Sequence, residues 1–221
     1  MDWYVSIVKF FQEGGVFMYP IVLVFAFGFV IMVERWVFLT GAGTSNRRIW
    51  TKVMPLVTQG RYREADELAR KSKTAIGSIL GYGLDRVRSA RRRDDIEKAM
   101  EESLLEVMPR LERRTHYLAT LANVATLLGL LGTIIGLIRA FTAVAAANPA
   151  EKADLLSASI SVAMNTTAFG LMAAIPLLLG HTWLQTKTTE MVDSLEMASV
   201  KFLNTITERA QTQTQPQAGA A

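Results

Sequence analysis

Residues 117–138 read YLATLANVATLLGLLGTIIGLI and contain no side chain that is charged at neutral pH. A helix needs roughly 20 predominantly apolar residues to cross a bilayer core about 30 Å thick, so this run is long enough to span a membrane. Residues 14–33 and 155–180 form two more runs without a charged side chain. Buried helices of soluble proteins rarely have this pattern three times in one chain. The sequence therefore predicts an all-α membrane protein with three transmembrane helices.

The charged residues between these runs predict the orientation of the chain. Residues 34–116 contain 18 Lys and Arg against 12 Asp and Glu, a net charge of +6, whereas residues 1–13 and 143–154 together have a net charge of −2. Segments with excess Lys and Arg usually stay on the cytoplasmic side. We therefore expect a multi-pass protein of the bacterial inner membrane, with a periplasmic N terminus and a cytoplasmic C terminus. The first run lacks a preceding basic region and a cleavage site, so it is not expected to be a signal peptide.

Helical periodicity and composition divide the chain into eight segments. Apolar residues recur at helical spacing from Asp94 toward the second run and from Trp183 to Phe202, so the second and third transmembrane helices are expected to extend into a cytoplasmic helical bundle. Pro109 should bend the first of these extensions. The expected segments are an interfacial amphipathic segment (1–13), transmembrane helices (14–39, 117–142 and 155–182), a cytoplasmic helical domain (40–116) with helices around 50–58, 62–71 and 76–90, a periplasmic loop (143–154), a cytoplasmic helix (183–210) and a disordered tail (211–221).

Several functional classes are excluded by what the sequence lacks. The chain has no cysteine, which excludes disulfides and thiolate chemistry. No nucleophile and base, metal-binding cluster or phosphate-binding glycine loop occurs at a meaningful spacing, so neither an enzyme nor a cofactor is expected. The basic run at residues 91–93 suits a solvated loop near acidic lipid better than a nucleic-acid site.

Small and hydroxyl-bearing residues share one face of each of the last two runs. On the second run this face includes Thr126, Gly129, Thr133 and Gly136, and the large aliphatic residues lie opposite. On the third run it includes Thr167, Gly170 and His181, with Thr166 beside them. Small residues let membrane helices approach closely, so helix packing alone accounts for such faces. The alternative is a polar path for an ion.

An ion path along Thr133 and Thr167 would need a further component. Hydroxyl groups bind Na⁺ or hold a water chain for H⁺, but they do not take up and release a proton at neutral pH. None of the three runs contains Asp or Glu, so a partner subunit must supply the carboxylate. Pro176 frees a backbone carbonyl that is either an ion ligand or the site of a simple kink. His181 is either a proton relay at the cytoplasmic end or an interfacial residue.

Three stretches resemble, in order and spacing, the transmembrane helices of ExbB and TolQ proteins. They are Gly14-Gly15 through Met18-Tyr19-Pro20 to Glu34-Arg35 for the first helix, residues 111–114 (LERR), 118–122 (LATLA) and 129–136 (GLLGTIIG) for the second, and residues 166–176 (TTAFGLMAAIP) for the third. The resemblance is thus to the MotA/TolQ/ExbB proton channel family. It implies a homopentamer around an ExbD/TolR-like dimer of single-span subunits whose membrane Asp carries the translocated H⁺ or Na⁺. Ion flow would drive movement of that partner. The resemblance leaves open whether a TonB-like or TolA-like effector also takes part.

The resemblance also assigns roles to individual residues. Thr133 and Thr167 match the pore-facing threonines of the family. Gly129, Gly132, Gly136 and Gly170 are assigned to helix packing because they are small, and Pro176 to a kink. Val162 departs from the pattern because ExbB and TolQ proteins typically have Glu there. Asn165 and Thr166 add polar groups beside Thr167, which suits either ion. Three functions remain open: a motor for transport or envelope maintenance, a stator for gliding or flagellar motility, and a passive membrane scaffold.

Overall fold

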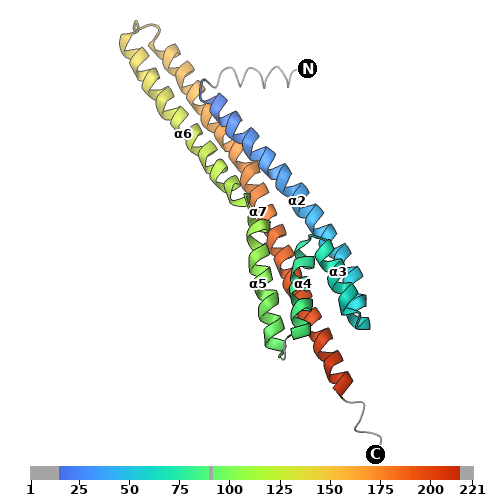
Figure 1. Cartoon of the computed structure of the whole chain (residues 1–221). Coiled ribbons are helices and arrows are strands. Elements are labelled where there is room, and N and C mark those ends of the chain that lie inside the picture. The colour runs from blue at the N-terminus through green and yellow to red at the C-terminus, as the bar shows by residue number, and fades with distance from the viewer. Residues whose placement is uncertain (1–14, 90–91, 215–221) are drawn as a thin grey trace, which may run out of the picture. The chain divides into compact units, whose positions relative to one another are not determined.

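The computed structural model describes residues 15–89 and 92–214, and these residues form helices and connecting turns without a strand. The helices are α2 (Met18–Gln59), α3 (Tyr62–Lys71), α4 (Ala75–Ser89), α5 (Arg93–Glu112), α6 (Thr115–Ala146) and α7 (Lys152–Thr214), shown in Figure 1. Three helical segments, within Met18–Gln59, Arg93–Ala146 and Lys152–Arg209, are long and apolar enough to cross a membrane. The predicted fold class is therefore confirmed, and the chain is a multi-pass membrane protein.

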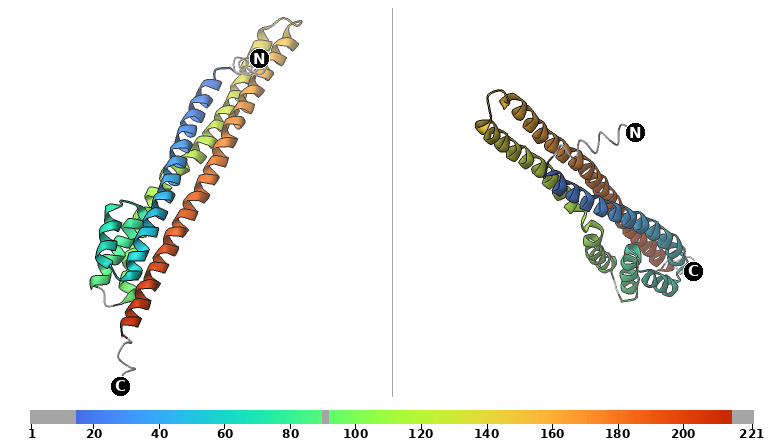
Figure 2. Two further views of the ribbon diagram at one scale, coloured as in Figure 1. Left: turned by 90° about the vertical axis from the view of Figure 1, so that its right-hand side faces the viewer. Right: turned by 90° about the horizontal axis from the view of Figure 1, so that it is seen from above.

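The chain forms two compact units, which are described separately. The first contains residues 114–184 together with the described residues up to Arg35, and the second contains the described residues of 36–113 and those from Gln185 to Thr214. In the first unit the beginning of α2, the whole of α6 and the first half of α7 lie side by side (Figures 1 and 2). In the second unit α3, α4 and α5 pack beside the later parts of α2 and α7.

The second unit is a helical bundle with large side chains in its core. Phe202 of α7 is fully buried, and its ring lies against Gly83 of α4 and beside Met100 of α5. Its other large buried side chains are aliphatic, and burial of such side chains supplies most of the stabilisation of a soluble core. They include Val53, Val57, Ile76, Ile79, Leu80, Leu84, Leu195 and Leu203. Charged side chains lie on the outside, where Arg70 donates a hydrogen bond of 2.7 Å to Asp66.

The first of the three apolar helices continues further than expected. The helix predicted around residues 50–58 is the end of α2, which runs without a break from Met18 to Gln59. Gly60 ends it with a positive φ of 80°. Its N–H donates to Val57 O at 3.0 Å, and the N–H of Arg61 donates to Leu56 O at 2.9 Å. This pair of bonds is the usual glycine-dependent termination of an α-helix.

The second apolar helix differs from the prediction at its start. It was expected to continue from the preceding helix, but α5 ends at Glu112 and α6 begins at Thr115. Arg114 has a φ of 66°, and a residue in this left-handed conformation cannot continue a right-handed helix. The helices that run on through both units are therefore α2 and α7. Pro109 lies inside α5, one turn before its end.

The ends of the chain fall partly outside the described residues. The interfacial segment predicted for residues 1–13 lies outside them, as do residues 215–221 of the predicted tail. The helix α7 extends to Thr214, into the first part of that tail. The segment boundaries predicted from charge, with their sides of the membrane, remain predictions.

Candidate functional site: the contact between α6 and α7

Helices α6 and α7 pack against each other through small residues. Gly136 faces Ala163, Gly132 faces Thr166, and Gly129 faces Gly170. In these three pairs the residue number on α7 rises as the residue number on α6 falls, so the two helices are antiparallel. The residues buried on α6 are mostly small, whereas large apolar side chains such as Leu127, Leu130, Leu131, Ile134, Ile138 and Phe141 are exposed. The face predicted from the helical wheel overlaps this buried face: Gly129 is buried, whereas Thr126, Thr133 and Gly136 are partly buried.

The closest approach occurs where two glycines meet. A Cβ atom at Gly170 would lie 2.8 Å from the carbonyl oxygen of Ala125 and 2.9 Å from the Cα of Gly129. A Cβ atom at Gly129 would lie 3.2 Å from the Cα of Gly170. Because these neighbours are backbone atoms, they cannot move aside as a flexible side chain would. Glycine at both positions therefore lets the two backbones touch.

Three threonines cluster directly beside this glycine contact. The hydroxyl oxygens of Thr133 and Thr167 are in direct contact across the helix pair. Thr167 Oγ1 donates to the carbonyl oxygen of Gly129 at 2.9 Å, and Thr133 Oγ1 lies 3.2 Å from the same oxygen. Thr166, only 2% exposed, donates to Val162 O at 3.0 Å. The structure thus brings together the two threonines that the sequence assigned to an ion path.

The two hydroxyl groups cannot make all three contacts as full hydrogen bonds. Each hydroxyl has one hydrogen, while the contacts to the Gly129 carbonyl and between the hydroxyls require three. At any moment one contact lacks a hydrogen, and the oxygens of Thr133 and Thr167 keep lone pairs that can accept. Both side chains are only partly buried. The cluster can therefore accept a hydrogen bond from water or bind a cation, and it can change its bonding without moving a helix.

The neighbouring candidates contribute in different ways. Asn165 is partly buried next to Thr166. Thr126 donates to Ala122 O at 3.1 Å and lies about 10 Å along α6 from Thr133. Val162, at the position where the family pattern has Glu, directs its Cγ1 toward Gly15, 3.4 Å from where a Cβ of that residue would be.

Two predicted site residues are not brought to the cluster. Pro176 and Met172 are exposed, and the freed Met172 carbonyl lies about 7 Å further along α7 than Thr167. His181 is partly buried about 21 Å from Thr167 along the same helix. Neither residue can bind an ion jointly with Thr133 and Thr167 in this arrangement.

Sequence reasoning missed the contacts that α2 makes in the same unit. A Cβ at Gly28 would lie 2.6 Å from Leu177 Cδ2, so α2 packs tightly on α7. Where α6 begins, Arg114 Nη1 donates to both carboxylate oxygens of Glu34, at 3.2 and 3.1 Å. This pair joins the start of α6 to α2 next to the left-handed turn at Arg114. The isolated Gly28 was the feature of the sequence that could have indicated the contact between α2 and α7. No feature of the sequence indicated the pairing of Glu34 with Arg114.

The chemistry available at this contact is limited to binding and hydration. Residues 117–138 and 155–180 contain no Asp or Glu, and the described residues contain no group of three His, Cys, Asp or Glu placed to hold a metal ion. A hydroxyl cluster can solvate an ion, but it cannot carry a proton as an acid does. The residues described at this contact can therefore solvate an ion but do not supply a group that takes up and releases a proton near neutral pH.

Comparison with known proteins places these features in a family. Residues 71–197 match the model of the MotA/TolQ/ExbB proton channel family. A putative biopolymer transport protein ExbB homolog of Methanothermobacter thermautotrophicus is 28% identical over 89% of this chain and 69% of its own length. The Tol-Pal system protein TolQ of Haemophilus influenzae is 32% identical over 50% of this chain and 46% of its own length. An ExbB-like protein of Synechocystis is 31% identical over 75% of this chain and 65% of its own length.

The family match covers more than half of the chain and includes α6 together with most of α7. It therefore includes the glycine contact and all the threonines described above. The chain belongs to the MotA/TolQ/ExbB proton channel family.

Proposed function

We propose that this chain is the multi-spanning stator subunit of an ion-driven motor in the bacterial inner membrane. Its N terminus would be periplasmic, and its second unit would lie in the cytoplasm. The observation that supports this proposal best is the hydroxyl pair of Thr133 and Thr167, which share the Gly129 carbonyl at a contact of two membrane helices. Membership of a proton channel family makes ion passage the natural role for such a cluster.

The ion carrier is assigned to a partner. Because the spans of this chain lack Asp and Glu, the proposed partner is an ExbD/TolR-like single-span subunit with an Asp in the membrane. A homopentamer of this chain would surround that partner, and the exposed large apolar residues of α6 would face lipid or neighbouring copies. Ion flow would then move the partner and pass work to a periplasmic or outer-membrane client, through a TonB-like or TolA-like effector where one is present.

The cluster of Thr133 and Thr167 would act as a polar station opposite the partner carboxylate. When the carboxylate is charged, it needs hydrogen-bond donors, and the hydroxyls can turn their hydrogens from the Gly129 carbonyl toward it. When the carboxylate is neutralised by H⁺ or Na⁺, the hydroxyls can return to the carbonyl. This exchange costs little because both states satisfy the threonine hydrogens.

A passive scaffold is the second candidate, and one observation favours it. Thr126 and Thr166 donate to carbonyls of their own helices, and Thr167 donates across to α6, so every one of these hydroxyls has a partner inside the protein. Such bonds are sufficient for helix packing without any ion.

Reconstitution separates the two candidates. The chain is co-expressed with its single-span partner, and cation flux is measured in liposomes for Thr133→Val, Thr167→Val and the control Thr142→Val. Thr142 is exposed on α6 and donates only within its helix, to Ile138 O at 2.8 Å. The motor proposal predicts that flux is lost in the first two variants and kept in the control. Flux in none of the proteins, including the wild type, would favour the scaffold.

The same preparation identifies the coupling ion. Function that depends on Na⁺ and resists a protonophore would make Asn165, Thr166 and Thr167 a sodium site. Function that a protonophore abolishes at every Na⁺ concentration would make them part of a hydrated proton path.

A further inference from the structure

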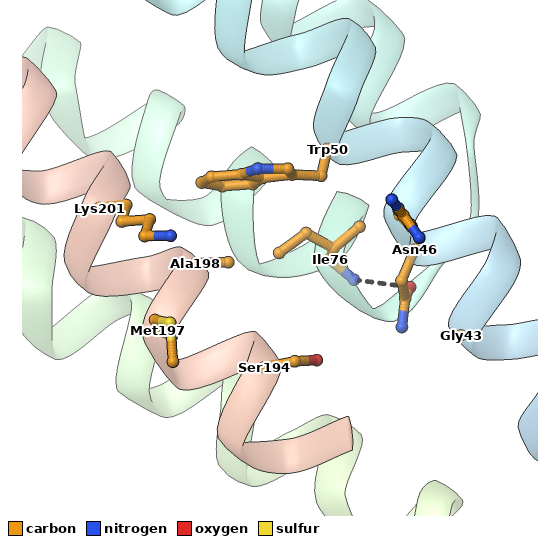
Figure 3. A pocket seen from close by; sticks show the side chains of 9 residues that line it. Gly43, Asn46, Trp50, Ile76, Ser194, Met197, Ala198 and Lys201 are labelled. Atoms are coloured by element: carbon orange, nitrogen blue, oxygen red, sulfur yellow. Dashed lines mark hydrogen bonds between the residues drawn. The ribbon is translucent and has the colours of Figure 1, made fainter. Parts of the chain in front are cut away.

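The second unit contains a groove between two helices that face each other with matching spacing. Gly43, Asn46, Arg47 and Trp50 line it from α2, and Ser194, Met197, Ala198 and Lys201 line it from α7. Both sets follow the same helical repeat, so each presents one face. Ile76 of α4, only 2% exposed, lies between them as the floor. Figure 3 shows Trp50, Lys201 and Asn46 around this floor, and the groove has a volume of about 370 Å³.

The charged groups at this groove are all positive. Arg47 and Lys201 line it from opposite helices, and no Asp or Glu is among its lining residues. Neither cation is paired with a carboxylate of the part of the chain that the structure describes. Elsewhere in this unit exposed cations do find acids, as in the pairs Arg61 with Glu64 and Lys187 with Glu190. Two unpaired cations facing one groove produce a local positive potential that attracts an anion.

A buried amide at the groove has unused hydrogen-bonding capacity. Asn46 is only 7% exposed, and its Oδ1 accepts from the N–H of Ile76 at 3.2 Å. This bond satisfies a free N–H in the first turn of α4. The Nδ2 of the same amide has no acceptor among the described residues. A buried donor without a partner costs about 1–3 kcal/mol. Because Nδ2 is itself buried, a ligand oxygen reaches it only if the Asn46 side chain turns toward the groove.

The apolar part of the groove suits a flat ring. Trp50 presents its indole ring along one side, and Met197 and Ala198 continue the apolar surface on α7 (Figure 3). Indole rings stack on planar heterocycles, and methionine adapts its shape to such ligands. Small-molecule sites have volumes of roughly 300–1,000 Å³, so this groove is at the lower end of that range.

We propose that this groove binds an organic phosphate of the size of a nucleoside monophosphate. The ring of the ligand stacks on Trp50 over the Ile76 floor, and the phosphate lies between Arg47 and Lys201. The site lies wholly within the second unit, and the inference does not depend on the proposed motor function.

A lipid headgroup is the other source of an organic phosphate, and the position of the groove disfavours it. The first transmembrane helix predicted from the sequence ends at residue 39. Asn46 and Trp50 are about 10 and 16 Å further along α2. The attraction of anionic lipids falls off within a Debye length of about 8–10 Å at physiological salt. A soluble ligand can reach this depth more easily than the phosphate of a lipid that stays in the bilayer.

Calorimetric titration of the purified full-length protein in detergent tests the proposal. The probes are adenosine monophosphate and guanosine monophosphate. Adenosine and inorganic phosphate are titrated separately as the two parts of the nucleotide. Phosphatidylglycerol vesicles test binding of a lipid headgroup. At least one nucleotide is expected to bind at least tenfold more tightly than adenosine or inorganic phosphate. Lys201→Gln and Trp50→Leu are each expected to weaken binding at least tenfold, and Trp50→Phe, which keeps a ring, should weaken it less.

Arg48→Gln and Lys52→Gln are the matched controls, because both residues are exposed cations on α2 that do not line the groove. They should leave the affinity unchanged. Circular dichroism and gel filtration of each variant check that the fold and assembly are kept. The proposal is overturned if neither nucleotide binds, if inorganic phosphate binds as tightly as the nucleotides, or if the controls weaken binding as much as Lys201→Gln. Binding of phosphatidylglycerol vesicles that depends on Lys201, with no binding of nucleotides, would assign the groove to lipid and also overturn it.

Discussion

The contact between α6 and α7 in the first unit buries a different kind of residue from the core of the second unit, although α7 runs through both units. The contact between α6 and α7 consists mainly of glycine, alanine and threonine, and large aliphatic side chains of α6 are exposed, whereas Ile21 and Leu177 are buried elsewhere in the first unit. In the second unit Phe202 and a set of large aliphatic residues are buried, and the charges lie outside. Lipid gives large apolar side chains no reason to be buried, whereas water does. The comparison shows that membrane helices associate by close backbone approach, which also places polar threonines against each other.

The largest effect is expected at the core of the second unit. Phe202→Ala removes a fully buried ring beside Gly83 and Met100 and should destabilise the protein by about 3–5 kcal/mol. Phe141→Ala is the control in the first unit, because Phe141 is 62% exposed there. Thermal unfolding in detergent should show a large loss of stability for the first variant and little change for the second. Equal losses of stability in the two variants would contradict the proposed difference between the two units.

Close packing in the first unit is tested by a single methyl group. Gly170→Ala places a Cβ against the backbone of Ala125 and Gly129, so the helices must move apart, at a cost of about 1–3 kcal/mol for overpacking. The control is Gly41→Ala in α2 of the second unit, where nothing lies within 4 Å of the new atom. That change should stabilise the helix by about 0.5–1 kcal/mol. Thermal unfolding of both variants gives the comparison, and a neutral Gly170→Ala would show that the glycine contact is looser than described.

The amide that joins α2 to α4 should have an intermediate effect. Asn46→Ala removes the acceptor for the N–H of Ile76, and loss of such a bond to a first-turn donor costs about 0.5–2 kcal/mol. Hydrogen exchange at the start of α4 should increase while exchange in α6 stays unchanged. Faster exchange throughout both units would mean that they do not unfold separately.

The smallest effect is expected at the ion pair of the first unit. Glu34 and Arg114 have side chains 45% and 46% exposed, and exposed pairs contribute about 0–1 kcal/mol. Glu34→Gln should therefore lower thermal stability only slightly, and the decrease should be even smaller at high salt. A large loss would indicate that this pair is shielded in the assembled complex.

The helices and the placement of Thr133 and Thr167 on the packing faces of α6 and α7 could be predicted from the sequence, because each depends on a local pattern. Charge-free runs report the membrane directly, and the spacing of Thr133 and Thr167 relative to Gly129 and Gly170 follows from helical geometry. The break at Arg114 could not be predicted, because its left-handed conformation accompanies a contact with Glu34, far away in sequence. The same holds for the pairing of Asn46 with Ile76, which arises only when two helices meet. Of the two roles left open for the carbonyl that Pro176 frees, the distance of about 7 Å along α7 disfavours binding an ion jointly with Thr167.

The most direct test of the proposed ion path compares two substitutions at Thr167 that remove different groups of the side chain. Thr167→Ser keeps the hydroxyl and removes the methyl group, whereas Thr167→Val keeps the volume and removes the hydroxyl. Cation flux is measured for both variants in liposomes that contain the assembled complex with its single-span partner. The account predicts that Thr167→Ser conducts and Thr167→Val does not, with both complexes intact. Flux through Thr167→Val at the wild-type rate would contradict it and leave the threonines with a role in packing alone.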